Sequence, residues 1–144
     1  MYVKGKTVMT RRRAVRFLSK THGAVLMVHG FAQNRFAWHI EGRSLANYVA
    51  EAGYDVFHID LRGTRDSRKL GAKMPRSCYE YVEIDLCQAV RLATLVSGHE
   101  KLTVIGHSLG GALSCSVAAI MPEFIDGVVH VRKCISFICY IKIL

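Results

Sequence analysis

The segment Gly106-His107-Ser108-Leu109-Gly110 holds the residue types in this sequence that are best suited to chemistry. A serine with a glycine two residues before it and another two residues after it, between a strand and a helix, is the pattern of a nucleophile elbow. A side chain at either glycine would collide with neighbouring backbone, and the following helix directs free N–H groups at a reacting oxygen. Ser108 is therefore the candidate nucleophile. The alternative is a structural serine in a tight strand-to-helix turn.

Hydrophobic periodicity surrounds this motif with alternating strands and helices. We expect strands at 24–28, 54–59 and 102–105, helices at 44–52, 79–96 and 112–121, and a polar loop at 61–77. This order predicts an α/β fold with a mostly parallel sheet and helices on both faces. Ligands bind at the carboxyl ends of the strands in such sheets. His29, Asp60 and Ser108 all fall at such ends.

Three further segments, 29–38, 52–56 and 60–63, strengthen the pattern: His-Gly-Phe-Ala-Gln-Asn-Arg-Phe-Ala-Trp, Ala-Gly-Tyr-Asp-Val and Asp-Leu-Arg-Gly. Together with the elbow they make residues 24 to about 130 resemble the N-terminal half of the α/β-hydrolase family. The similarity is to lipase-like members, including acid lipases and relatives of polyester synthases and depolymerases. Polyester synthases carry a cysteine in the elbow, so Ser108 favours hydrolase or transferase chemistry on an ordinary ester.

The resemblance also implies roles for particular groups. Backbone N–H groups of Phe31 and Leu109 would form the oxyanion hole. The elbow and the oxyanion turn would be supported by His29, Gly30, Gly106, His107 and Gly110. The implied substrate is a small-molecule or lipid-like carboxylic ester, cleaved through an acyl-enzyme on Ser108. The loop at 64–67, Thr-Arg-Asp-Ser, departs from the family's usual His-Gly and serine, so substrate contacts are not carried over to it.

The triad acid and histidine of the family follow the serine in the chain, in the order Ser, Asp or Glu, His. After Ser108 the candidates are Glu123, Asp126 and His130. The two acids are expected between a helix and a strand at the far end of the sheet, and His130 inside that strand. None is expected within hydrogen-bond reach of Ser108.

The chain is therefore interpreted as a single partial α/β-hydrolase domain over 1–144, apparently truncated after the elbow helix. It divides into basic N-terminal strands or an extension (1–23), a core (24–130) and an atypical apolar tail (131–144). An incomplete sheet would leave an edge through which the chain could associate. The alternative to an esterase is thus an inactive fragment that acts, if at all, as an interaction module.

The net charge of +9 is concentrated near the N-terminus, where residues 1–40 contain eight basic and no acidic residues. An anionic membrane, a nucleic acid or a transit-peptide receptor could use such a segment, but solvated edge strands are the favoured interpretation, and no nucleic-acid partner is expected. No signal peptide and no stretch long enough to cross a membrane is expected.

Five cysteines form an odd set without a CxxC pair, which favours buried thiols in a reducing, cytoplasmic setting. No metal and no cofactor is expected, because no ligand cluster, P-loop or GxGxxG motif occurs. Among the remaining histidines, His58 is expected to form a buried polar pair with Asp60, which lies two residues on in the same strand.

Overall fold

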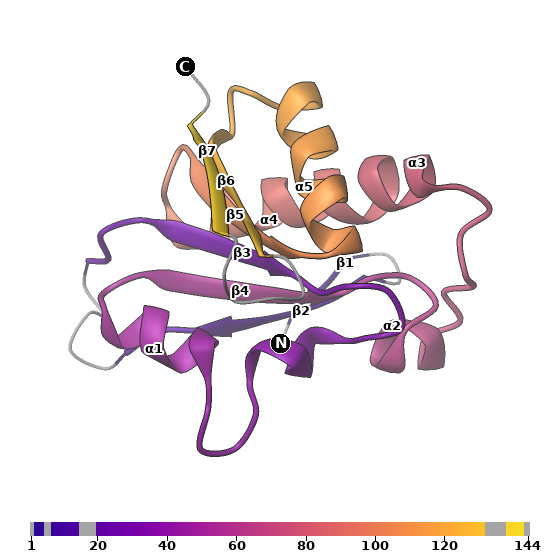
Figure 1. Cartoon of the computed structure of the whole chain (residues 1–144), viewed down its shortest axis with the longest axis horizontal. Coiled ribbons are helices and arrows are strands. Elements are labelled where there is room, and N and C mark those ends of the chain that lie inside the picture. The colour runs from indigo at the N-terminus through magenta and orange to yellow at the C-terminus, as the bar shows by residue number, and fades with distance from the viewer. Residues whose placement is uncertain (1, 5–6, 15–19, 132–137, 143–144) are drawn as a thin grey trace.

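One mixed sheet organises the part of the chain that the computed structural model describes, residues 2–4, 7–14, 20–131 and 138–142. Within those ranges the strand order is β1-β2-β4-β3-β5-β6-β7 (Figure 1). The strands are β1 (Tyr2–Lys4), β2 (Thr7–Arg12), β3 (Ala24–Val28), β4 (Asp55–Asp60), β5 (Leu102–His107), β6 (Ile125–Val131) and β7 (Ile138–Lys142). The four central strands, β4-β3-β5-β6, pair in parallel, whereas β1, β2 and β7 pair antiparallel at the flanks. The predicted mostly parallel α/β architecture is confirmed.

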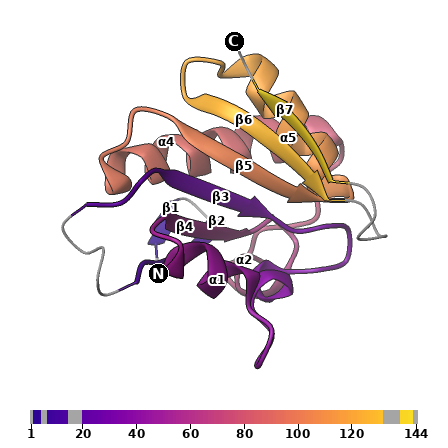
Figure 2. The ribbon, with the colours of Figure 1, turned by 60° about the vertical axis from the view of Figure 1, so that its left-hand side comes forward.

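Helices lie on both faces of this sheet, as predicted. In Figures 1 and 2, α1 lies on one side, and α4 and α5 lie on the other. The helical elements are the 3-10 helix η2 (Arg35–Trp38), α1 (Leu45–Glu51), α2 (Arg65–Lys69), α3 (Cys78–Glu80), the π-helix η3 (Tyr81–Leu86), α4 (Cys87–Ser97) and α5 (Leu109–Ile120).

The central strand β3 is buried along its whole length because both of its faces are covered. Val25 and Met27 pack with Trp38 and α1 in one core, while Leu26 and Val28 pack with α4 and α5 in the other. Alternate side chains of a strand point to opposite faces. The continuous apolar run in the sequence therefore reflects two cores and not one.

Several boundaries differ from the sequence-based expectation. The polar segment predicted as a loop contains α2, which has Asp66 in its first turn and Arg68 and Lys69 in its last turn. These charges complement the helix dipole, so a polar segment can be helical. The elbow helix begins at Leu109, three residues earlier than predicted. The thiol expected to be buried at Cys78 is exposed.

The N-terminal basic residues that the structure describes turn into the fold. The Arg11 Nε donates to Asp55 Oδ1 at 2.8 Å, and Arg13 forms a second ion pair with the same buried carboxylate. Burial alone would raise the pKa of Asp55, but the hydrogen bonds from these two arginines hold it below its usual value. Part of the basic character thus has a structural use, which favours the edge-strand interpretation.

His58 lies within β4 and is not paired with Asp60, which corrects the sequence-based expectation. Its Nε2 accepts a hydrogen bond from Arg12 at 3.2 Å, and its buried Nδ1 has no partner among the described residues. Burial, together with the neighbouring guanidinium of Arg12, lowers the pKa of His58 from 6.5 to about 4. The neutral imidazole is therefore the form that the fold accommodates.

This pKa makes folding stability depend on pH. The unfolded chain binds a proton at His58 below about pH 6.5 and the folded chain only near pH 4, so acidification favours the unfolded state between these values. We expect the free energy of unfolding to fall across this window by up to about 1.4 kcal/mol per pH unit from this one site. His58→Gln retains an acceptor for Arg12 and should flatten the slope. Urea denaturation at a series of pH values measures it.

The exposed His22 provides the matched control, as His22→Gln. A slope that changes as much in this variant as in His58→Gln would contradict the assignment.

Candidate functional site

Ser108 occupies a strained turn between β5 and α5. Its backbone lies at φ 51° and ψ −115°, a conformation that a residue with a side chain rarely adopts. Its N–H donates to the Val131 carbonyl at 3.0 Å, and its own carbonyl accepts from the Gly111 N–H at 2.9 Å. The residue is exposed although the residues of β5, which it follows, alternate between buried and half-buried. The turn thus presents the hydroxyl to solvent at the carboxyl end of the sheet.

The glycines around Ser108 allow three backbones to approach one another. A Cβ on Gly106 would lie 2.5 Å from the Gly111 nitrogen and would also overlap the carbonyl of Gly110. A Cβ on Gly110 would lie 2.5 Å from the His29 carbonyl oxygen and closer still to that of Val28. These contacts are with backbone, which has no rotamer that could relieve them. The spacing of the motif is therefore a packing requirement between α5, β3 and β5.

His29 fixes the turn that follows β3. Its imidazole is buried, Nδ1 lies 2.8 Å from the Gly30 carbonyl oxygen, and Nε2 lies 3.1 Å from the Leu61 nitrogen. Because the Leu61 N–H donates, Nε2 is the acceptor and the proton is on Nδ1. Burial lowers the pKa of His29, which keeps this neutral tautomer. The ring thereby ties the turn after β3 to the end of β4.

Gln33, which the sequence analysis did not single out, joins the same turn to the elbow. Its side-chain carbonyl accepts from the Gly30 N–H at 2.9 Å, and its Oε1 lies 2.9 Å from Nδ1 of His107. The side chain of His107 is thus directed at the turn after β3 and not at Ser108. The contact spans 74 residues of sequence, so no local pattern could have revealed it.

A cavity of about 430 Å³ opens beside this arrangement. Its lining includes His29, Gly30, Phe31 and Leu109, which the sequence analysis had predicted as site residues. The amide groups of Phe31 and Leu109 have no hydrogen-bond partner among the described residues. Leu109 is the first residue of α5, where helix geometry leaves the N–H free. Two free donors therefore belong to residues that line one cavity. Ser108 does not line this cavity itself but directly precedes Leu109 in the chain.

The described carboxylates near this edge of the sheet are held by arginines, and none forms a hydrogen bond with Ser108. Buried Asp60 accepts from the Arg35 N–H at 2.9 Å and pairs with the Arg35 guanidinium, which also reaches Asp66 at 2.6 Å. Hydrogen bonds from Lys69 and Arg35 lower the pKa of Asp66 to about 2. Asp85, buried in η3, accepts from the Arg62 backbone N–H at 2.9 Å. These acids brace the loops that surround the cavity.

His130 lies nearer to the elbow than its place in a strand suggested. It pairs with Gly106 across β5 and β6, and a Cβ on Gly111 would lie 2.6 Å from its Cγ. No hydrogen bond joins its ring, or any other described histidine or carboxylate, to the Ser108 side chain. Asp126 is the second residue of β6 and not part of the connection before it, as the sequence had suggested. It lies at the amino end of the strand, far from the elbow, as expected.

Among the described residues, no group of three or more histidine, cysteine, aspartate or glutamate side chains is placed to hold a metal ion. Within the same residues, no helix combines the length and apolarity needed to cross a bilayer.

Comparison with known proteins places this geometry in a family. The model of the alpha/beta hydrolase fold family matches residues 23–136. An uncharacterized protein of Mycobacterium tuberculosis is 29% identical over 126 residues, 88% of this chain and 33% of that protein. Mouse lipase member K is 31% identical over 127 residues, 83% of this chain and 30% of that protein. The chain thus spans about a third of the length of these relatives.

Solved structures of other proteins share this fold. An epoxide hydrolase mutant from Vigna radiata superposes with a TM-score of 0.61 at 20% identity, over 86% of this chain and 34% of that chain. The sheet and its helices therefore have the arrangement that the resemblance implied.

The close approach at Gly106 predicts a severe effect of a single methyl group. Gly106→Ala should destabilise the fold by about 3 kcal/mol, because the new Cβ meets backbone of α5 that cannot rotate away. Urea denaturation followed by circular dichroism measures this change. Gly23→Ala is the control, since its Cβ would meet only Tyr54 at an ordinary 3.6 Å. Equal stability of the two variants would contradict the packing argument.

The bridge through Gln33 predicts a local effect on the turn after β3. Gln33→Leu removes the acceptor of the Gly30 N–H, so this amide should exchange faster with solvent, and stability should fall by about 1–2 kcal/mol. Hydrogen exchange followed by NMR reports the Gly30 amide directly. Gln88→Leu, a half-buried glutamine in α4, is the control and should leave Gly30 unchanged. An unchanged exchange rate of the Gly30 amide in Gln33→Leu would contradict the role of this hydrogen bond.

Proposed function

The chain belongs to the alpha/beta hydrolase fold family, and from this premise we propose that it carries the nucleophile and the oxyanion hole of a serine esterase. The reaction is cleavage of a carboxylic ester, with Ser108 as the residue that takes up the acyl group. The observation that carries this proposal is the strained, exposed backbone of Ser108 at the start of α5. A structural serine has no need of a conformation that costs about 1–3 kcal/mol.

The proposed chemistry begins when the Ser108 oxygen attacks the ester carbonyl carbon. The carbonyl oxygen gains negative charge and accepts hydrogen bonds from the Phe31 and Leu109 N–H groups, which have no other partner among the described residues. The positive end of the α5 dipole adds to this stabilisation. The alcohol then leaves with a proton, and water releases the acid from the acyl-enzyme.

In this proposal, neighbouring residues hold the Phe31 and Leu109 N–H groups in position. His29 and Gln33 hold the turn that carries Phe31, while the glycines let α5 bring Leu109 close to it. An oxyanion hole works because its donors are fixed before the charge develops. A turn held by hydrogen bonds on both sides suits that requirement.

A histidine must take the proton of Ser108 for rapid turnover, with an acid behind it. None of the described histidines forms a hydrogen bond with the hydroxyl, so we assign no residue of this chain to either role. The chain spans about a third of the length of these relatives. Ester turnover by the whole protein is therefore proposed together with the role of Ser108.

An ester is the favoured substrate class. The relatives include a lipase as well as an epoxide hydrolase, and a serine hydroxyl is suited to accept an acyl group. Apolar side chains of Phe31, Leu61 and Met74 line the cavity, which fits a small-molecule or lipid-like acyl chain.

A second candidate is a chain without turnover that acts, if at all, through association. The absence of any described histidine or carboxylate on the Ser108 side chain favours it. In that case the outer strands of the described sheet, β1 and β7, offer backbone for pairing with another chain.

Labelling with a fluorophosphonate probe distinguishes these candidates. We expect the folded chain to be labelled at Ser108, located by mass spectrometry, and labelling to be lost in Ser108→Ala. Soluble imidazole should accelerate the reaction because it supplies the missing base. Ser116→Ala is the control, since Ser116 is an exposed serine of the same helix.

Failure of the folded chain to react at Ser108, even with imidazole, would favour the second candidate. Labelling that persists in Ser108→Ala would place the reactive group elsewhere.

A further inference from the structure

The segment that follows β4, which includes α2, concentrates positive charge beside the candidate active site. Residues 62–76 hold six basic side chains and one acidic side chain, Asp66. The basic residues are Arg62, Arg65, Arg68, Lys69, Lys73 and Arg76. Five of these six line one of two cavities at the carboxyl end of the sheet.

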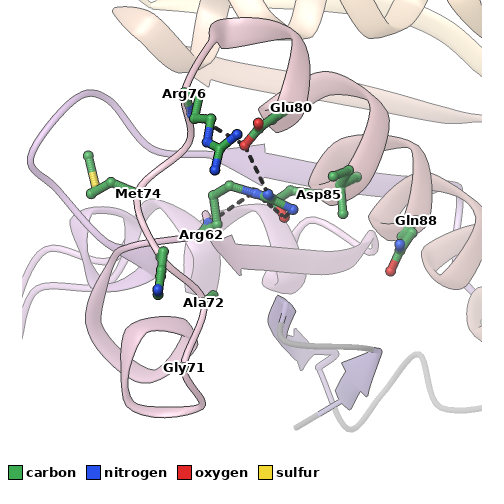
Figure 3. A pocket seen from close by; sticks show the side chains of 10 residues that line it. Arg62, Gly71, Ala72, Met74, Arg76, Glu80, Asp85 and Gln88 are labelled. Atoms are coloured by element: carbon green, nitrogen blue, oxygen red, sulfur yellow. Dashed lines mark hydrogen bonds and ion pairs between the residues drawn. The ribbon is translucent and has the colours of Figure 1, made fainter.

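The two cavities are neighbours. The cavity of about 430 Å³ beside Phe31 and Leu109 has Arg65 and Arg68 as its charged lining residues. A second cavity, of about 480 Å³, is lined by Arg62, Lys73 and Arg76 and by residues of α3, η3 and α4, among them Glu80 and Asp85. Figure 3 shows Arg62 beside Glu80 and Asp85. Met74 lines both, so a ligand that reaches past Met74 would extend from the oxyanion donors to the second group of cations.

The acids of this region are already engaged. Arg62 bonds to both carboxylates of the second cavity, with Nε 3.2 Å from Asp85 Oδ2 and Nη1 3.3 Å from Glu80 Oε2 (Figure 3). Asp60 and Asp66 form ion pairs with Arg35, and Asp66 forms another with Lys69.

Four cations remain around the cavities, Arg65, Arg68, Lys73 and Arg76, none with an ion pair to a described carboxylate. Arg65 lies over the ring of Phe36, 4.2 Å from its centroid. The other three side chains are exposed and belong to the same loop.

The loop that carries them is held in place. The Gly63 N–H donates to the Ala72 carbonyl at 3.1 Å, and the Ser67 hydroxyl donates to the Asp60 carbonyl at 2.8 Å. Met74 fills the space where a Cβ of Gly63 would lie, which closes the loop on itself. Cations on an anchored loop lose less freedom when they bind an anion than cations on a mobile one.

We propose that the substrate is an ester that also carries an anionic group, a carboxylate or a phosphate, and that Arg68, Lys73 and Arg76 bind this group. The inference rests on the proposed esterase function and names its substrate class. The reacting carbonyl lies at the amides of Phe31 and Leu109. The anionic group lies beside Met74, which lines both cavities, with Arg68 on the side of the first cavity and Lys73 and Arg76 on the side of the second. The cations border cavities, which fits a compact ligand better than the flat surface of a membrane.

Binding to the Ser108→Ala chain tests this proposal without turnover. The probes are monoethyl adipate, which is an anionic ester, diethyl adipate, which is its neutral counterpart, and hexyl phosphate. We expect NMR titrations to show both anions binding at least about tenfold more tightly than the diester, with an affinity that falls as salt is added. The triple variant Arg68→Gln/Lys73→Gln/Arg76→Gln should lose this preference.

The matched control is Lys101→Gln, an exposed cation just before β5 and thus at the opposite end of the sheet. Equal binding of the diester, or an equal loss of anion binding in Lys101→Gln, would overturn the proposal. Binding to phosphatidylglycerol vesicles without binding of hexyl phosphate would overturn it in favour of a membrane surface.

Anion binding and fluorophosphonate labelling test the anion site and the esterase activity independently. Anion binding without fluorophosphonate labelling at Ser108 would leave the anion site standing and remove the esterase. Labelling together with equal affinity for charged and neutral esters would do the reverse.

Discussion

The contact between the first turn of α5 and the backbones of β3 and β5 is the constraint on which the site depends. Backbone meets backbone there, so only glycine fits at 106 and 110. This approach brings the N-terminus of α5 to the turn after β3, and it places two free amides beside one cavity. A larger side chain at either position would move α5 away and separate the donors. Packing and the geometry proposed for catalysis are therefore the same requirement.

Much of this arrangement could be predicted from the sequence because its signals are local. The apolar run at 24–28, the glycine spacing around Ser108 and the alternation of strands with helices each depend on a few consecutive residues. Their agreement indicated a parallel sheet with the candidate residues at one edge. The family match and the described strand order agree with that prediction.

Contacts between distant segments could not be predicted in this way. Gln33 reaches His107, Arg35 reaches Asp60, and the ring of His130 packs against Gly111 only after the sheet has formed. Helix α2 could not be predicted from hydrophobic periodicity, because its residues are polar and its single buried side chain is Ser67. The excess of basic over acidic side chains in residues 62–76 is visible in the sequence, but which acids pair with these cations is not. Most of these features depend on contacts between residues that are far apart in the sequence.

The hydrogen bond from the Ser108 amide to the Val131 carbonyl has a consequence for how the chain is made. During translation, residues 102–120 leave the ribosome before residues 125–131 of β6 do. The turn at Ser108 then lacks both this acceptor and the neighbouring strand against which β5 is held. Its strained backbone can become the stable conformation only when residue 131 has emerged, because strain persists only where surrounding structure enforces it. The turn at Ser108 is therefore completed late, when β6 docks beside β5.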